Sequence, residues 1–120
     1  MSRYFSPGEF ERCSPACKID DVDESFLVRL DVAREFAGVP FVLNSAFRTP
    51  EYEVSKGRSG FSAHCEGRAV DIRCLTDEQR AKIVAGLLAA GFDRIGIAPR
   101  FIHVDDSKSK RHPRIWLYSK

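Results

Sequence analysis

The stretch R-A-V-D-I-R (68–73) decides the fold, because it sets one carboxylate within a run of small or apolar residues. Such a run predicts a short, largely buried β-strand. Successive side chains of a strand point to opposite faces of a sheet, so Val70 and Ile72 would face the core and Asp71 the other side. The stretch therefore predicts a sheet with one apolar face and one polar face.

A second stretch, F-I-H-V-D (101–105), repeats this alternation. Ile102 and Val104 would enter the core, whereas His103 and Asp105 would share the polar face. If the two strands are neighbours, these two polar side chains lie within a few side-chain lengths of the carboxylate on the first strand. The two stretches together predict a polar cluster built on adjacent strands.

The polar cluster has the composition of a metal site. His64 would reach Asp71 and His103 from the loop before the first strand, in the string S-A-H-C-E-G (62–67). Two neutral imidazoles and one carboxylate suit Zn²⁺, and three protein ligands leave a fourth tetrahedral position open, as in catalytic sites. The same donors also serve manganese or iron. Spacing alone leaves the alternative of ordinary packed histidines and a turn-forming aspartate.

Three motifs follow one another along the chain: N-S-A-F-R-T-P-E-Y (44–52), S-A-H-C-E-G-R-A-V-D-I (62–72) and F-I-H-V-D (101–105). Taken in this order, they resemble the zinc D-alanyl-D-alanine carboxypeptidase family of murein peptidases, which includes phage endolysins, and the likeness extends over nearly the whole chain. The resemblance implies a zinc metallopeptidase that hydrolyses D-residue-containing stem peptides of peptidoglycan, as a phage or prophage lysis enzyme. It further implies that His64, Asp71 and His103 bind Zn²⁺.

The resemblance also implies substrate-binding residues. Arg48 would hold a substrate carboxylate or the developing oxyanion, a role that suits a permanently charged, planar guanidinium. Ser62 is a second expected substrate contact. A solvated arginine in the turn before Pro50 is the alternative for Arg48.

The general base of the family has no counterpart here. Several members carry a catalytic glutamate three residues before the last histidine ligand, where this chain has Arg100. Asp105, on the same predicted face as His103, is the first candidate for the base, and an equally good alternative is that it accepts the other ring N–H of His103. The remaining candidates are Glu66, Asp93 and His112.

Two other functions stay open. One is a zinc amidohydrolase that acts on a small dipeptide at the same site. The other is a non-catalytic binding or virion domain that keeps the fold and the metal, which the missing glutamate favours and the presence of Arg48 opposes.

Length and charge agree with a small enzyme. The chain of 120 residues is expected to form one domain over residues 1–120, and its net charge of +2 gives no reason to expect nucleic acid as a partner. No stretch has the length of a membrane span or the apolar core of a signal peptide. We therefore expect a monomer made in the cytoplasm that acts at the cell wall after release, host lysis or virion delivery. The basic string K-S-K-R-H-P-R (108–114) is expected to be a solvated loop.

The rest of the sequence predicts an α+β scaffold. An amphipathic helix is expected over 23–37, closed by Gly38, and a second helix runs from Thr76 to about Ala90. Further elements are a short strand at 41–43, a mobile polar rim at 53–61, a hairpin of 94–98 with 101–105 and an edge strand at 115–118. These elements predict helices packed on a mainly antiparallel sheet whose other face carries the zinc site.

Four cysteines are expected to be free, mostly buried thiols. Cys13 and Cys17 could instead form a small metal knuckle, although no matching second pair exists. Cys65, next to His64, is a possible adventitious zinc ligand.

Overall fold

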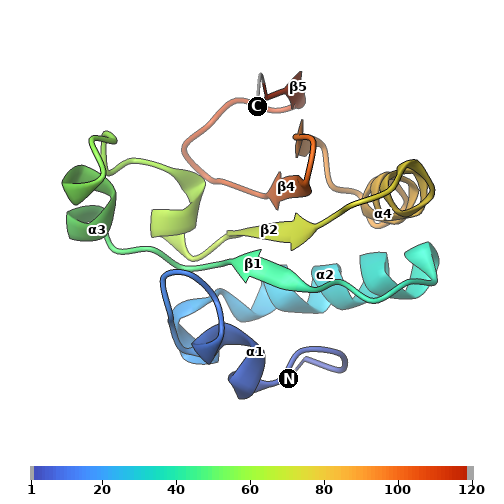
Figure 1. Cartoon of the computed structure of the whole chain (residues 1–120), viewed down its shortest axis with the longest axis horizontal. Coiled ribbons are helices and arrows are strands. Elements are labelled where there is room, and N and C mark those ends of the chain that lie inside the picture. Colours follow the sequence, from blue (N-terminus) through green and yellow to red (C-terminus); the bar gives the residue numbers. More distant parts are fainter. Residues whose placement is uncertain (1, 119–120) are drawn as a thin grey trace.

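A computed structural model describes residues 2–118, which form one five-stranded sheet with helices on it (Figure 1). The elements, in chain order, are α1 (Pro7–Glu11), η1 (Ile19–Asp21), α2 (Glu24–Ala37), β1 (Leu43–Ser45), α3 (Pro50–Ser55), η2 (Ala63–Glu66), β2 (Ala69–Arg73), α4 (Asp77–Ala89), β3 (Arg94–Ile97), β4 (Phe101–Asp105) and β5 (Arg114–Leu117). The predicted α+β class is confirmed.

The strands lie in the order β1-β2-β4-β3-β5, and every neighbouring pair is antiparallel except β3 and β5. One row of partners runs across the whole sheet, from β1 to β5. It consists of Ser45, Asp71, His103, Gly96 and Trp116. Because partners in a row share a face, this register alone brings side chains from distant parts of the sequence together.

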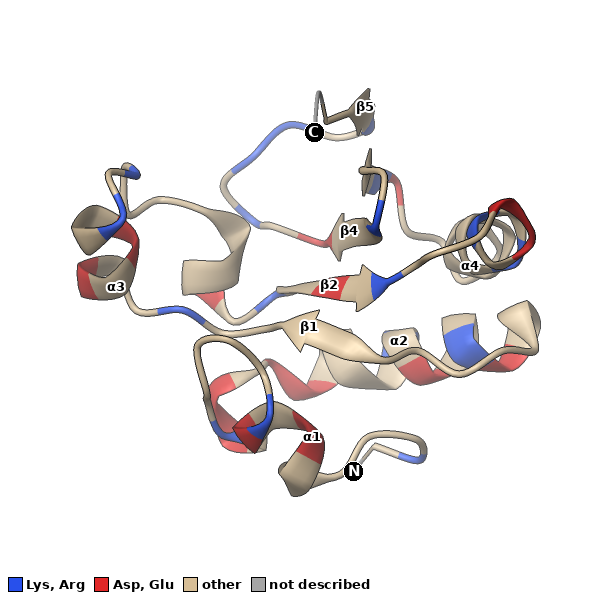
Figure 2. Ribbon diagram, in the orientation of Figure 1, with Lys and Arg blue, Asp and Glu red and all other residues tan. Residues whose placement is uncertain are grey.

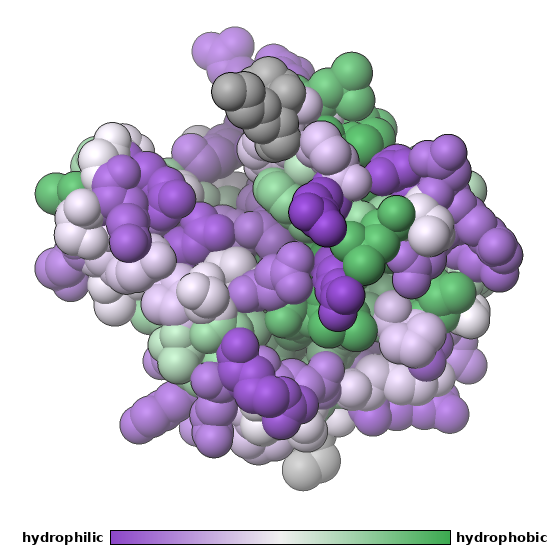
Figure 3. All heavy atoms as spheres, in the orientation of Figure 1, coloured by the Kyte–Doolittle hydropathy of each residue, from purple (hydrophilic) through white to green (hydrophobic). Residues whose placement is uncertain are grey.

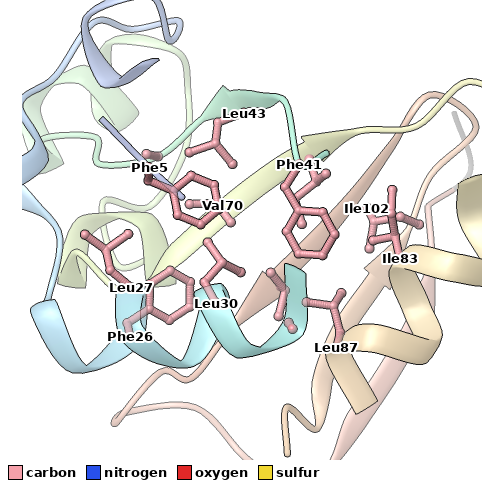
Figure 4. Close-up of a cluster of buried hydrophobic side chains, with 14 of the residues drawn as sticks. Phe5, Phe26, Leu27, Leu30, Phe41, Leu43, Val70, Ile83, Leu87 and Ile102 are labelled. Carbon is pink, nitrogen blue, oxygen red and sulfur yellow. The ribbon is translucent and has the colours of Figure 1, made fainter. Parts of the chain in front are cut away.

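Helices α2 and α4 cover the apolar face of the sheet. Figure 4 shows side chains from both helices meeting those of β1, β2 and β4. The two helices approach closely at Gly86, where an added Cβ would lie 2.5 Å from the carbonyl oxygen of Ala33. As predicted, Val70, Ile72, Ile102 and Val104 are fully buried in this core.

The ends of both helices follow their capping signals. The Asp23 carboxylate accepts a hydrogen bond of 3.0 Å from the backbone N–H of Phe26, and Gly38 closes α2 with a left-handed φ of 70°. Thr76 caps α4 by accepting from the N–H of Gln79 at 3.1 Å. The Gln79 side chain accepts from the N–H of Leu75 (3.0 Å), just before the cap.

Two local predictions are corrected. The strand expected at 41–43 is β1 at Leu43–Ser45, because Phe41 packs into the core ahead of the strand. The polar segment 53–61 was expected to be a rim throughout, but its first residues belong to α3. Thr49 caps that helix and Pro50 occupies its first turn, a combination that favours helix initiation. The remainder, 56–61, is a turn-rich loop.

None of the helices among residues 2–118 is long and apolar enough to cross a membrane. Figure 3 shows hydrophilic side chains over most of one face of the molecule, with hydrophobic ones between them. The four cysteines are free, as predicted, with Cys13 and Cys74 buried.

Candidate metal centre

His64, Asp71 and His103 converge on the polar face of the sheet. Asp71 on β2 lies opposite His103 on β4, and η2 carries His64 to the start of β2. One ligand atom from each residue lies within 4.8 Å of the other two, and all three residues are buried. The three predicted metal ligands therefore form one cluster.

Each imidazole is oriented by an acceptor on its outer side. Nδ1 of His64 lies 2.6 Å from the carbonyl oxygen of Ala46, and Nε2 of His103 lies 2.6 Å from Oδ2 of Asp105. With a metal bound, these contacts would keep the protons on the outer nitrogens and leave Nε2 of His64 and Nδ1 of His103 to bind the ion. Those inner nitrogens lie 3.4 Å and 3.0 Å from Oδ1 of Asp71. Metal-binding histidines are typically held this way, so the donor set fits Zn²⁺.

Hydrogen bonds keep the buried carboxylates charged. Burial by itself raises the pKa of Asp71, but hydrogen bonds from His103 and His64 outweigh it and hold that pKa well below its usual range. Burial likewise opposes ionisation of Asp105, and its contact with His103 again lowers the pKa. Both groups are thus anionic and suited to bind or to balance a cation.

Asp105 contacts the ring nitrogen of His103 that faces away from Asp71. It is fully buried, and its Oδ1 accepts from Nε of Arg94 (2.8 Å) and from the backbone N–H of Ser107 (3.0 Å). Its Oδ2 accepts from His103. Because both oxygens are engaged, the geometry favours the orienting role for Asp105 over the role of general base.

Arg48 is held at the cluster by three contacts. Its Nε donates to Oγ of Ser45 (3.0 Å), one terminal nitrogen donates to Oε1 of Glu53 (3.2 Å) and the other to Oδ2 of Asp71 (3.1 Å). A guanidinium has five N–H groups, so others remain for a substrate. The substrate-binding role of Arg48 stays a prediction.

Glu53 is the functional candidate that sequence reasoning missed. It is fully buried on α3, and its carboxylate contacts Arg48, Arg58 (2.7 Å) and Oγ of Ser62 (2.9 Å). Burial opposes ionisation, but these donors, Arg58 first, lower its pKa overall. The spacing Arg48, Glu53, Arg58 was the available signal, and it lay in a segment whose polarity suggested only a solvated rim.

A pocket of about 410 Å³ opens over the cluster. An aromatic wall of Phe101, Trp116 and Tyr118 forms part of its lining, and Ser62 lines it as well. The ring of Trp116 lies 5.5 Å from that of His103, and it passes over Gly96, where a Cβ would come within 2.7 Å of the indole. Glycine at this position therefore lets the aromatic wall reach the cluster.

The other sequence candidates lie elsewhere. Glu66 accepts hydrogen bonds from the 107–109 segment, and Asp93 contacts His112, so none of these three lines the pocket. Arg100 is exposed. Among residues 2–118 the potential metal cluster contains no cysteine, so neither the Cys13–Cys17 knuckle nor Cys65 as a ligand is supported.

Comparison with known proteins gives one match. A family model described as Peptidase M15 matches residues 3–105, which is the greater part of the chain and includes all three residues of the cluster. No curated protein and no solved structure matches the chain.

Proposed function

The chain belongs to the Peptidase M15 family, and on this premise we propose that it is a zinc-dependent peptidase that hydrolyses D-residue-containing stem peptides of bacterial peptidoglycan. The membership confirms the family resemblance of the three sequence motifs and implies a metallopeptidase. The single observation that carries the proposal is the buried His64–Asp71–His103 cluster, in which the outer nitrogen of each imidazole is already held.

The chemistry follows from the residues around the cluster. Bound there, Zn²⁺ would supply Lewis acidity, which activates water and polarises the scissile carbonyl. Asp105 holds His103 in the tautomer whose Nδ1 is free to bind a metal. Arg48 places positive charge beside Asp71, where it would stabilise negative charge that develops on the substrate. Ser62 offers a hydroxyl at the pocket wall.

The likeness of the three motifs to murein peptidases supports peptidoglycan as the substrate. The likeness to phage endolysins supports action at the cell wall after release, host lysis or virion delivery. Arg48 also supports turnover over the alternative of a non-catalytic binding domain. It contacts Asp71 of the cluster and still has N–H groups available. A group that stabilises a reacting carbonyl needs such free donors.

The test combines metal content with activity. Purified protein is assayed for bound metal by mass spectrometry and for release of free amines from purified murein, before and after chelation. We expect near-stoichiometric zinc and release that chelation abolishes and added zinc restores. Zinc without release would favour the binding domain, release from small dipeptides alone would favour the dipeptidase, and a protein that retains no metal would overturn the proposal.

A further inference from the structure

A line of alternating charges leads from the metal cluster to the rim of the pocket. Asp71 contacts Arg48 at 3.1 Å, Arg48 contacts Glu53 at 3.2 Å, and Glu53 contacts Arg58 at 2.7 Å. The inner members are nearly buried, whereas the side chain of Arg58 is 52% exposed. The line therefore ends in a cation that faces both the pocket and solvent.

The backbone fixes Arg58 in this position. Its N–H donates to the carbonyl oxygen of Glu53 at 2.9 Å, and Lys56 and Gly57 donate in the same way to the last turn of α3. Gly57 has a φ of 79°, which allows the chain to turn sharply after the helix. The single contact of its guanidinium with Glu53 leaves most of its N–H groups available for a ligand.

A second cation reaches the same pocket from another segment. Lys110, between β4 and β5, lines the pocket together with Arg58, and its ammonium makes no ion pair with any residue in the described part of the chain. Figure 2 shows that the loop after α3 and the connection from β4 to β5 both carry basic residues. The cation of Arg94, by contrast, is engaged with Asp105.

We propose that Arg58, assisted by Lys110, binds a free carboxylate of the peptide substrate and so selects acidic peptides over their neutral counterparts. This inference rests on the proposed function and deepens it. A guanidinium with free N–H groups suits a carboxylate, because the two planar groups can form paired hydrogen bonds. The carboxylate can belong to the C-terminus of the peptide or to an acidic side chain, and both sources share this chemistry.

Glu53 acts as a positioning residue in this arrangement. Its buried carboxylate ties Arg58 to Arg48, so the site that recognises the substrate and the cation beside Asp71 are held by one group. Charge-assisted hydrogen bonds of this kind are directional, so they order the Arg58 side chain before the substrate binds. Binding then removes less conformational entropy from that side chain.

Three matched peptides test the proposal on the zinc-loaded protein. The first ends in D-Ala-D-Ala with a free carboxylate, the second is its C-terminal amide, and the third is that amide with a glutamate inserted next to D-Ala-D-Ala. Equilibrium dissociation constants and kcat/KM are measured for each. We expect the free acid to bind about tenfold more tightly than the amide. A gain for the third peptide would identify a side-chain carboxylate as a second source.

Arg58→Gln should reduce this preference to less than about threefold, mainly by weakening binding of the free acid. Lys56→Gln is the control, because it removes one charge from the same loop outside the pocket and should preserve the preference. Equal binding of all three peptides by the unaltered protein, or an undiminished preference in Arg58→Gln, would overturn the inference. Selective binding without cleavage would uphold the inference and refute the proposed peptidase activity.

Discussion

The two faces of one sheet are built from the same strands and have opposite chemistry. On β2 and β4, Val70 and Ile102 point into a core closed by α2 and α4, while their neighbours Asp71 and His103 point into the pocket. The apolar face is stabilised by removal of hydrocarbon from water. This interaction depends on close packing and is not directional. The polar face is also buried, and it depends on the placement of individual hydrogen bonds.

The polar face avoids the usual cost of buried polar groups because its members satisfy one another. No buried side-chain nitrogen or oxygen among residues 2–118 lacks a hydrogen-bond partner. An unpartnered buried polar group typically costs about 1–3 kcal/mol, so a cluster of this size requires that each member be in place. Because the polar face carries the proposed metal ligands, changes there should mainly alter function, whereas changes on the apolar face should mainly alter stability.

His103→Ala should give the largest effect and separates the faces most clearly. Metal binding and hydrolysis should both fall to background, because one of three ligands is lost. The chain should remain folded by circular dichroism, since Asp71 keeps its contact with Arg48, and Asp105 keeps Arg94 and Ser107. Full activity in this variant would refute the metal centre.

Ile102→Ala probes the other face at the adjacent position of β4. The side chain is fully buried, so its truncation should lower the free energy of unfolding by about 3 kcal/mol. Zinc content and kcat/KM should stay close to those of the unaltered protein at a temperature where the variant is folded. Urea denaturation supplies the stability, and a stable variant that lost its zinc would break the separation of the two faces.

Asp105→Asn tests a residue of the polar face that contacts His103 but is not one of the three proposed metal ligands. Loss of an orienting carboxylate typically reduces metal affinity or activity by about 10–100-fold. We expect zinc affinity, measured by competition with a chromogenic chelator, to fall by that amount together with kcat/KM. A drop in kcat with undiminished zinc affinity would instead assign Asp105 the role of general base.

His112 and Asp93, outside both faces, should show the smallest effect. Nδ1 of His112 lies 2.5 Å from the Asp93 carboxylate, and this hydrogen bond raises the pKa of His112 above 6.5. Because the folded-state pKa is raised, the stabilisation is complete below pH 6.5 and is lost as the pH rises through the folded pKa. For a pair so exposed, we expect less than about 1 kcal/mol.

NMR titration of the His112 ring measures this shift directly. Asp93→Asn should return the pKa toward 6.5, and the difference in unfolding free energy between this variant and the unaltered protein should be larger at pH 5.5 than at pH 9. A difference that is independent of pH would contradict the assignment.

Alternation along the strands made the site predictable. The period of two separated Val70 and Ile72 from Asp71, and the same pattern in 101–105 placed His103 beside it. Capping signals likewise located both long helices, because the preferences that end a helix act within a few residues.

Long-range pairing was harder to predict. The spacing Arg48, Glu53, Arg58 does not by itself show that the glutamate is buried between the two arginines, because its burial depends on how α3 folds back toward β1 and η2. The parallel placement of β5 beside β3 likewise depends on the connection from 106 to 113, which carries no periodic pattern. The orienting position of Asp105 became clear only with the register of β3 against β4.

The row of partners from Ser45 to Trp116 gives the folding chain a means of distinguishing correct from incorrect sheet assembly. A slip of one residue between β2 and β4 would turn one strand over, sending its carboxylate or imidazole into hydrocarbon and its aliphatic side chains toward water. Such a mispaired chain would lose core packing and metal affinity in the same step. Because metal binding contributes to folding free energy, zinc would favour the correctly paired sheet, and its uptake during refolding would report when that pairing is complete.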